Sequence, residues 1–230
     1  AGAPEHHPLL LADGPDLPAV VCVPSIGSPP DASPFVRLAS GFTGRRAVRA
    51  LEAPGYRDGE LLPASLEPLL DLWAEELAAS PAEPAAPPPA TRVVLLGHSS
   101  GGWFAHALAE RLRERGAPAA ALVLLDTLPP GTRSHPLVEE AAFRVADHAT
   151  ADFPTAAALT AGIAYRDLIA DWSPAAAVTP TLFLRPRDSS MGLAWPFPHH
   201  AVDVPGDHFS VLDRHARPTA AAVRAWLDSR

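Results

Sequence analysis

The stretch "RVVLLGHSSGGWF" at residues 92–104 decides the fold of this 230-residue chain. It opens as an apolar, β-branched run, which is typical of a buried strand, and continues with the pattern of a helix. Between the two, Gly97-His98-Ser99-Ser100-Gly101 fits the pattern G-x-S-x-G. A tight strand-to-helix turn needs such small neighbours, and it holds the central hydroxyl above the sheet edge at a helix N-terminus. The sequence therefore predicts a nucleophile at Ser99; the competing interpretation is a plain Gly/Ser turn.

Apolar runs and helical patterns alternate along most of the chain. We expect strands within residues 18–25, 46–55, 92–97, 120–126, 179–186 and 200–206. We expect helices at residues 35–42, 66–79, 100–115 and 217–230, and a loop at the proline-rich residues 81–90. This alternation predicts a single α/β domain over residues 1–230, with a mostly parallel sheet and helices on both faces. The Ala-rich residues 131–172 interrupt it and are predicted to form an inserted helical lid.

Composition narrows the classes of function. The net charge of −8 argues against general nucleic-acid binding, and the absence of lysine excludes Schiff-base chemistry. The only cysteine, Cys22, lies in an apolar run and is predicted to be a buried structural thiol; a chain without intramolecular disulfides fits a reducing cytoplasm. No apolar stretch reaches the roughly 18 residues of a membrane helix, and no spacing of metal ligands is present. We therefore expect no membrane partner, no metal and no intrinsic cofactor.

A nucleophilic serine needs a base and an acid. His208 lies just after the last predicted strand and follows Ser99 in chain order, as α/β hydrolases require. Two acids compete for the third position. Asp126 ends the strand after that of the serine, and Asp188 follows the next strand, where most α/β hydrolases carry the acid. Both precede His208, so chain order alone leaves the choice open.

Other histidines receive structural interpretations. His98 is expected to point into the core, and His106 and His215 are expected on helix surfaces. His199 and His200 precede the last strand and are expected at the opposite edge of the sheet from His208.

Four motifs occur in order: "APGYRDGELLPAS" (53–65), "GHSSGG" (97–102), "LVLLDTLPPG" (122–131) and "WPF…VPGDHF" (195–209). Together they resemble the chain-terminating (type I) thioesterase domains of modular polyketide synthases, of the erythromycin and pikromycin type. The likeness runs from about residue 19 to 228 and implies the α/β-hydrolase fold. Its D-x-x-P-P context favours Asp126 over Asp188 as the acid. It also implies an oxyanion hole made of the backbone N–H groups of Ser100 and Ile26.

The resemblance implies a function as well. Ser99 would take a polyketide acyl chain from the phosphopantetheine arm of an acyl carrier protein. Water or a hydroxyl of the chain would then release it as an acid or a macrolactone. The chain would belong to the C-terminal portion of a larger synthase. Only about 18 residues precede the first predicted core strand, without the family's usual dimerisation helices, so a homodimer stays possible but open.

Several interpretations stay open. Tyr165, Phe153, Trp172 and Trp195 are candidate walls of a substrate chamber, or ordinary packing residues. The arginines of the helix after Ser99 could form a basic patch for a carrier domain, or a solvated helix face; they are Arg111, Arg113 and Arg115. Alternative functions are a free-standing type II editing thioesterase, a carboxylesterase for small esters, and a non-catalytic binding module.

Overall fold

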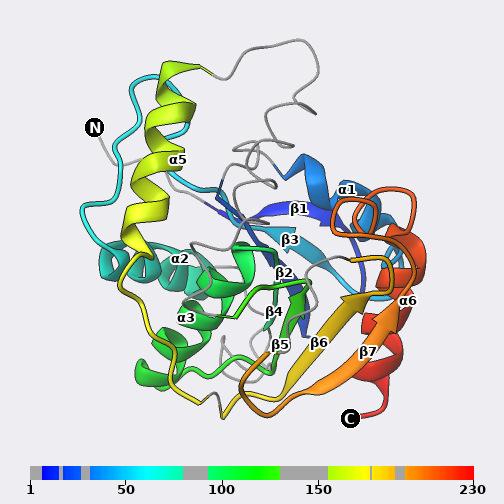
Figure 1. Cartoon of the computed structure of the whole chain (residues 1–230). Coiled ribbons are helices and arrows are strands. Elements are labelled where there is room, and N and C mark those ends of the chain that lie inside the picture. The colour runs from blue at the N-terminus through cyan, green and yellow to red at the C-terminus, as the bar shows by residue number, and fades with distance from the viewer. Residues whose placement is uncertain are drawn as a thin grey trace.

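The computed structural model describes residues 7–15, 18–26, 32–79, 93–129, 155–176, 178–189 and 195–230. Within them, one seven-stranded sheet has the order β1-β3-β2-β4-β5-β6-β7 (Figure 1). The strands are β1 Leu9–Ala12, β2 Ala19–Val23, β3 Val48–Ala50, β4 Val93–His98, β5 Ala121–Leu125, β6 Thr181–Pro186 and β7 His200–Val204. The helices are α1 Ser33–Ser40, α2 Leu66–Ala79, α3 Gly101–Glu114, α5 Ala156–Leu168 and α6 Ala216–Asp228.

Neighbouring strands from β3 to β7 all pair in parallel, which confirms the predicted mostly parallel sheet. The first strand, β1, was not predicted. It has four residues and pairs antiparallel with β3 at the edge of the sheet, where Leu9 and Leu10 are about half exposed. A run of four residues is too short to show a strand pattern in the sequence. It forms a strand because it pairs with the edge strand β3.

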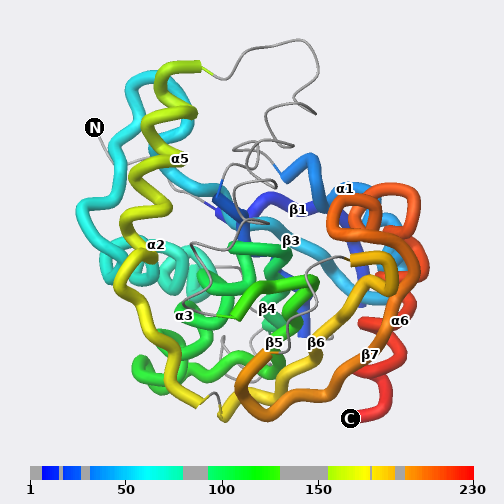
Figure 2. Tube along the Cα trace, viewed as in Figure 1, coloured from blue at the N-terminus to red at the C-terminus, as the bar shows by residue number. Residues whose placement is uncertain are grey.

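Side chains alternate between two apolar layers, one on each face of the sheet. Val21 and Val23 of β2 pack into the layer beneath α2, α3 and α5, whereas Val20 and Cys22 pack into the layer beneath α1 and α6. Figure 2 shows these two groups of helices on opposite sides of the strands. Cys22 is fully buried, and its burial raises the pKa of the thiol, which agrees with a structural role.

The described part of the predicted lid contains the helix α5. Its Tyr165 packs against Tyr56 and Phe104, and the Tyr165 hydroxyl donates to the Pro54 carbonyl at 2.9 Å. These contacts attach α5 to the segment after β3. Residues 131–154 of the lid, like the predicted proline-rich loop at residues 81–90, lie outside the described residues.

Among the described helices, none combines the length and the hydropathy needed to cross a bilayer.

Candidate active site

The turn between β4 and α3 has the strain that the sequence predicts. Ser99 has a φ of 56°, in the left-handed region that a non-glycine residue adopts at a cost of about 1–3 kcal/mol. A Cβ atom at Gly97 would lie 2.3 Å from the Gly101 carbonyl oxygen, and one at Gly101 would lie 2.8 Å from the Val23 carbonyl oxygen. Only glycine fits at both positions, so the glycines make a rigid turn rather than a flexible linker.

Asp126 and His208 form the central polar contact of the site. His208 Nδ1 lies 2.8 Å from Asp126 Oδ2, and the two residues are 9% and 7% exposed. Asp126 follows the last residue of β5 and has a φ of 43°; among described residues other than glycine, it shares the left-handed region only with Ser99. Such strain gathers where a fold holds functional side chains.

The position after β6, where most α/β hydrolases carry the acid, is occupied by Asp188 and Ser189, which do not contact His208 through a carboxylate in the described structure. Asp188 is exposed, and its backbone N–H donates to the Gly206 carbonyl at 2.9 Å. The next residue, Ser189, donates its hydroxyl to both carboxylate oxygens of Asp126, at 3.1 and 2.9 Å. The geometry therefore pairs the imidazole of His208 with Asp126. The sequence reasoning missed Ser189, whose only signal is its position beyond the carboxyl end of a central strand.

His98 joins the serine turn to the histidine turn. Its Nε2 donates to the backbone carbonyl of His208 at 2.8 Å, and the two imidazole rings lie 4.6 Å apart. Burial, followed by repulsion from His208, lowers the pKa of His98 to about 3, so the ring is neutral. The expectation that His98 simply fills the core was incomplete, because this side chain supports His208.

His98 links the turn that carries Ser99 to the turn that carries His208. His98 directly precedes Ser99, and its ring contacts that of His208 in a tilted arrangement, with an angle of 37° between the ring planes. Within the described chain, no hydrogen bond joins the Ser99 hydroxyl to His208. Catalytic hydrogen bonds are often long in the absence of substrate and tighten in the complex.

Ile26 and Ser100, the two predicted oxyanion donors, lie against each other. The Ile26 N–H donates to the Ser100 hydroxyl oxygen at 2.9 Å. Ser100 is also the N-cap residue of α3, the helix whose N-terminus faces the site. The structure thus brings the expected pair together, but the Ile26 hydrogen is directed to a side chain.

The predicted chamber residues are mostly buried. Tyr165 is 2% exposed and Trp195 is 3% exposed, so in the described structure they are packing residues rather than an open wall. Trp172 is partly buried in the same apolar layer. Phe153 lies outside the described residues.

His106 was predicted on a helix surface, and this prediction was wrong. It is fully buried in α3, where its ring contacts Trp172, Trp195 and Phe197. Burial lowers its pKa to about 4. The helical pattern could not reveal this, because the covering aromatic residues come from a distant part of the sequence.

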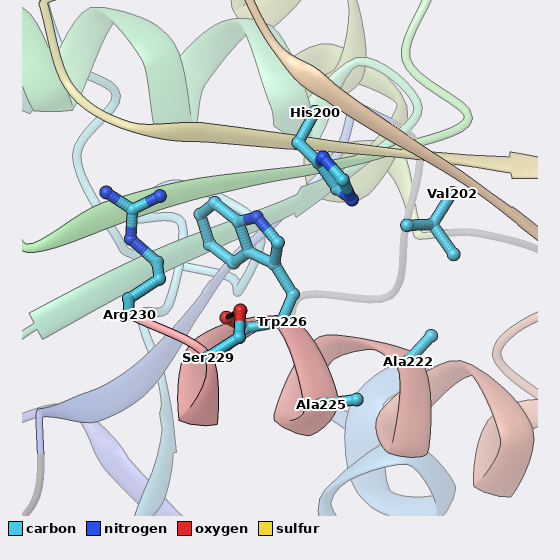
Figure 3. Close-up of a pocket in the computed structure, with 7 residues that line it drawn as sticks. All are labelled: His200, Val202, Ala222, Ala225, Trp226, Ser229 and Arg230. Carbon is cyan, nitrogen blue, oxygen red and sulfur yellow. Dashed lines mark hydrogen bonds between the residues drawn. The ribbon is translucent and has the colours of Figure 1, made fainter.

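His200 begins β7, whereas His208 follows its carboxyl end, as expected. It lines a shallow open groove of about 410 Å³ against Trp226 and Arg230 of the C-terminal region (Figure 3). This groove lies at the amino end of β7, so it is separate from the site at the carboxyl ends of the strands.

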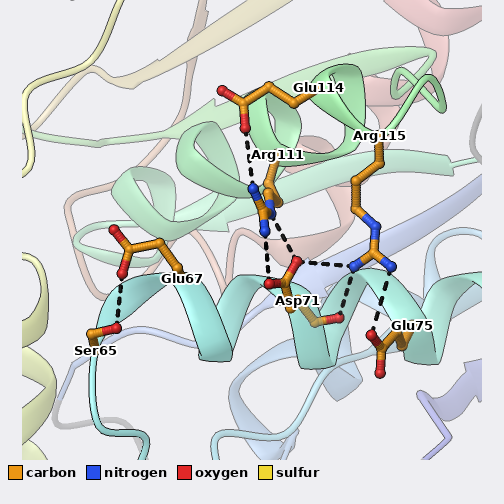
Figure 4. Close-up of polar contacts among 7 residues, drawn as sticks. All are labelled: Ser65, Glu67, Asp71, Glu75, Arg111, Glu114 and Arg115. Carbon is orange, nitrogen blue, oxygen red and sulfur yellow. Dashed lines mark hydrogen bonds and ion pairs between the residues drawn. The ribbon is translucent and has the colours of Figure 1, made fainter.

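Two interpretations were left open for the arginines of α3, a basic patch and a solvated helix face, and two of the three arginines are paired with acids. Arg111 binds both carboxylate oxygens of Asp71 on α2, at 2.8 and 2.7 Å, and Arg115 binds the same carboxylate at 3.0 Å (Figure 4). Glu114 and Glu75 add ion pairs at 3.4 and 3.6 Å. The hydrogen bond from Arg111 lowers the pKa of Asp71. Arg111 and Arg115 therefore join α3 to α2, whereas Arg113 is exposed on the same helix.

Among the described residues, no group of three or more histidine, cysteine or acidic side chains is arranged to hold a metal ion. The described site therefore consists of a serine turn, a histidine–carboxylate pair and backbone donors. This set of groups is suited to acyl transfer through a covalent serine intermediate.

Comparisons with known proteins agree with this chemistry. The thioesterase domain family matches residues 18–227. "Polyketide synthase GfsE" of Streptomyces halstedii is 39% identical over 229 residues, covering 95% of this chain and 6% of that protein. "Erythronolide synthase EryA3" of Saccharopolyspora erythraea is 34% identical over 226 residues, covering 94% of this chain and 7% of that protein. The chain thus spans less than a tenth of either relative.

Solved structures show the same fold. A Vlm2 thioesterase domain bound with a dodecadepsipeptide has a TM-score of 0.70 and 23% identity, with 95% of this chain and 96% of that chain covered. The NocB thioesterase domain, in covalent complex with a fluorophosphonate nocardicin G analog, has a TM-score of 0.71 and 22% identity, with 91% and 94% covered. The expected α/β-hydrolase fold is thereby confirmed.

Proposed function

We propose that this chain, which belongs to the thioesterase domain family, takes a polyketide acyl chain from an acyl carrier protein onto Ser99 and then releases it. The observation that carries the proposal is the buried hydrogen bond between His208 and Asp126, next to a serine held on a strained turn. The polyketide synthases among the relatives supply the substrate class and the carrier protein.

In the acylation step, His208 Nε2 accepts the proton of Ser99 as the hydroxyl oxygen attacks the thioester carbonyl. Asp126 accepts a hydrogen bond from Nδ1–H, which fixes the tautomer and stabilises the imidazolium. The oxyanion forms at the N-terminus of α3, where the Ser100 N–H and the helix dipole favour negative charge. Collapse of the tetrahedral intermediate breaks the C–S bond, and His208 returns the proton to the phosphopantetheine thiol. The products are an acyl-Ser99 ester and the free carrier thiol.

The second step reuses the same groups. His208 takes a proton from water or from a hydroxyl of the acyl chain, and the oxygen attacks the acyl-Ser99 ester. Water gives a linear acid, and the internal hydroxyl gives a macrolactone. The chemistry is identical, so the outcome depends on which nucleophile reaches the ester carbonyl in a productive geometry.

Residues 1–230 would then be one thioesterase domain of a larger multidomain synthase. A carrier domain tethered in the same polypeptide needs little affinity of its own, because the linker supplies a high effective concentration. The pairing of Arg111 and Arg115 with Asp71 agrees with such weak docking. A cytoplasmic location is expected from the lone thiol, which is buried.

The test is labelling with a fluorophosphonate probe, followed by turnover of a long hydroxyacyl thioester and mass analysis of the products. We expect the probe on Ser99 and faster turnover of the acyl thioester than of short aryl esters. Ser99→Ala should lose both labelling and turnover, and Ser65→Ala, at a partly exposed serine just before α2, should keep both. An unlabelled wild-type chain would indicate a non-catalytic binding module, and a preference for aryl esters would indicate a carboxylesterase.

A further inference from the structure

The side chain of Ser100 does not do what serine usually does at a helix N-cap. Ser100 is the N-cap residue of α3, but its hydroxyl makes no capping hydrogen bond to the helix. Serine is favoured at N-caps because its oxygen normally accepts from an N–H of the first turn. Here the hydroxyl oxygen instead accepts the Ile26 N–H at 2.9 Å, across 74 residues of sequence. The hydroxyl is therefore held toward the loop after β2, on the side of the expected oxyanion hole.

This contact changes what Ile26 can do. A backbone N–H has one hydrogen, and that of Ile26 is directed to the Ser100 oxygen. While this bond persists, Ile26 does not give an oxyanion a full hydrogen bond of its own. A hydroxyl that accepts one hydrogen bond still has its own proton to donate. Within the described residues, the hydroxyl of Ser100 donates to no protein acceptor, and Ser100 remains partly exposed.

We propose that the Ser100 hydroxyl is a catalytic donor of the oxyanion hole. The Ser100 N–H and O–H groups, which belong to one residue, both donate to the oxyanion on the carbon attacked by Ser99. Ile26 then acts as a positioning residue, because its N–H holds and polarises the hydroxyl. Ser100 keeps its proton throughout, so the hydroxyl stabilises charge without acid–base transfer. The proposal rests on the proposed acyl-transfer function.

The test compares Ser100→Ala, which removes the hydroxyl, with Ser100→Thr, which keeps it. Both are assayed for kcat and KM with a hydroxyacyl N-acetylcysteamine thioester. Both are also titrated with an acyl trifluoromethyl ketone, which forms an oxyanion on Ser99, and with the free acid product, which does not. Thermal unfolding of each variant checks the fold. If Ser100→Ala does not fold, Ser100→Cys takes its place, because a thiol is a poor donor of similar size.

We expect Ser100→Ala to lower kcat about a hundredfold, the usual effect of losing one oxyanion donor, with little change in KM. The affinity for the ketone should fall by a similar factor, while the affinity for the acid stays within about threefold. Ser100→Thr should restore most of kcat. Unchanged or faster turnover in Ser100→Ala would overturn the proposal and make the hydroxyl a competing acceptor. A fall in kcat without loss of ketone affinity would overturn it too.

Failure of the proposed function would look different. In that case the wild-type chain would neither turn over the thioester nor react with the ketone, and Ser99→Ala would match it. Normal wild-type turnover with an equally active Ser100→Ala would reject only the role of the Ser100 hydroxyl.

Discussion

Replacement of Asp126 by asparagine tests the central contact of the site. In the wild-type chain, Asp126 Oδ2 accepts from His208 Nδ1 at 2.8 Å, while both carboxylate oxygens accept the Ser189 hydroxyl. An amide has only one oxygen. Ser189, a hydroxyl donor, orients that oxygen toward itself and turns the NH₂ group toward His208. The amide then donates to Nδ1, which places the imidazole proton on Nε2, the atom that must accept the proton of Ser99.

The expected loss in kcat is about four orders of magnitude, the effect known for the same replacement in a serine protease triad. This factor corresponds to about 5.5 kcal/mol of transition-state stabilisation, at about 1.4 kcal/mol per tenfold change in rate. Asp126 is 7% exposed and asparagine has nearly the same shape, so the fold should be retained.

The assay is single-turnover formation of acyl-Ser99 from a hydroxyacyl thioester, followed by intact-protein mass spectrometry. The matched control is Asp188→Asn, at an exposed side chain in the position where most α/β hydrolases carry the acid. We expect the control to keep at least half of the wild-type rate. The reasoning is refuted if Asp126→Asn keeps more than a tenth of that rate, or if Asp188→Asn loses as much as Asp126→Asn.

Two further predictions concern stability. The free energy of unfolding of Ser99→Gly should be about 0.5–1 kcal/mol higher than that of Ser99→Ala. Glycine adopts the left-handed φ of 56° without strain, although it loses more conformational entropy on folding. Urea denaturation measures the difference, and a glycine variant less stable than the alanine variant would contradict the prediction. The pKa of His106 is about 4 in the folded chain and near 6.5 when unfolded, so the unfolded state binds the extra proton between these values. The share of His106 should therefore lower stability by up to about 3 kcal/mol from pH 7 to pH 4, in addition to the share of His98, whose pKa is also lowered. His106→Phe should flatten that dependence in urea denaturation, and an unchanged slope would rule out His106 as its source.

The serine turn could be predicted because its causes are local. Gly97, Ser99 and Gly101 are adjacent in sequence, and the steric limits of one turn determine which residues fit. The parallel strands were predictable for a similar reason, since each is a continuous apolar run. Errors arose where the environment of a residue comes from elsewhere in the chain. His106 is covered by distant aromatic residues that the helical pattern does not reveal. The choice left open for Arg111 depended in the same way on Asp71 of another helix.

The choice between two acids follows from the register of the sheet. His98 pairs with Leu125 across β4 and β5, so Ser99 and Asp126 are the next residues of adjacent parallel strands. The Ser99 N–H donates to the Leu125 carbonyl at 3.0 Å. The two residues with left-handed φ, Ser99 and Asp126, therefore lie next to each other at the same edge of the sheet. An acid at Asp126 therefore lies one strand from Ser99, the proposed nucleophile, whereas an acid after β6 lies two strands away.

In this register, the segment after β6 supports the contact between His208 and Asp126 rather than supplying the acid. His208 follows β7 and must reach back across the end of β6 to contact Asp126. The segment after β6 supports both partners of that contact. The backbone N–H of Asp188 donates to Gly206 in the turn before His208, and the Ser189 hydroxyl donates to Asp126. With the proposed acid, Asp126, at the end of β5, the end of β6 can support the pair with a backbone donor and a hydroxyl. The carboxylate of Asp188 itself is exposed, and only its backbone N–H takes part in this support.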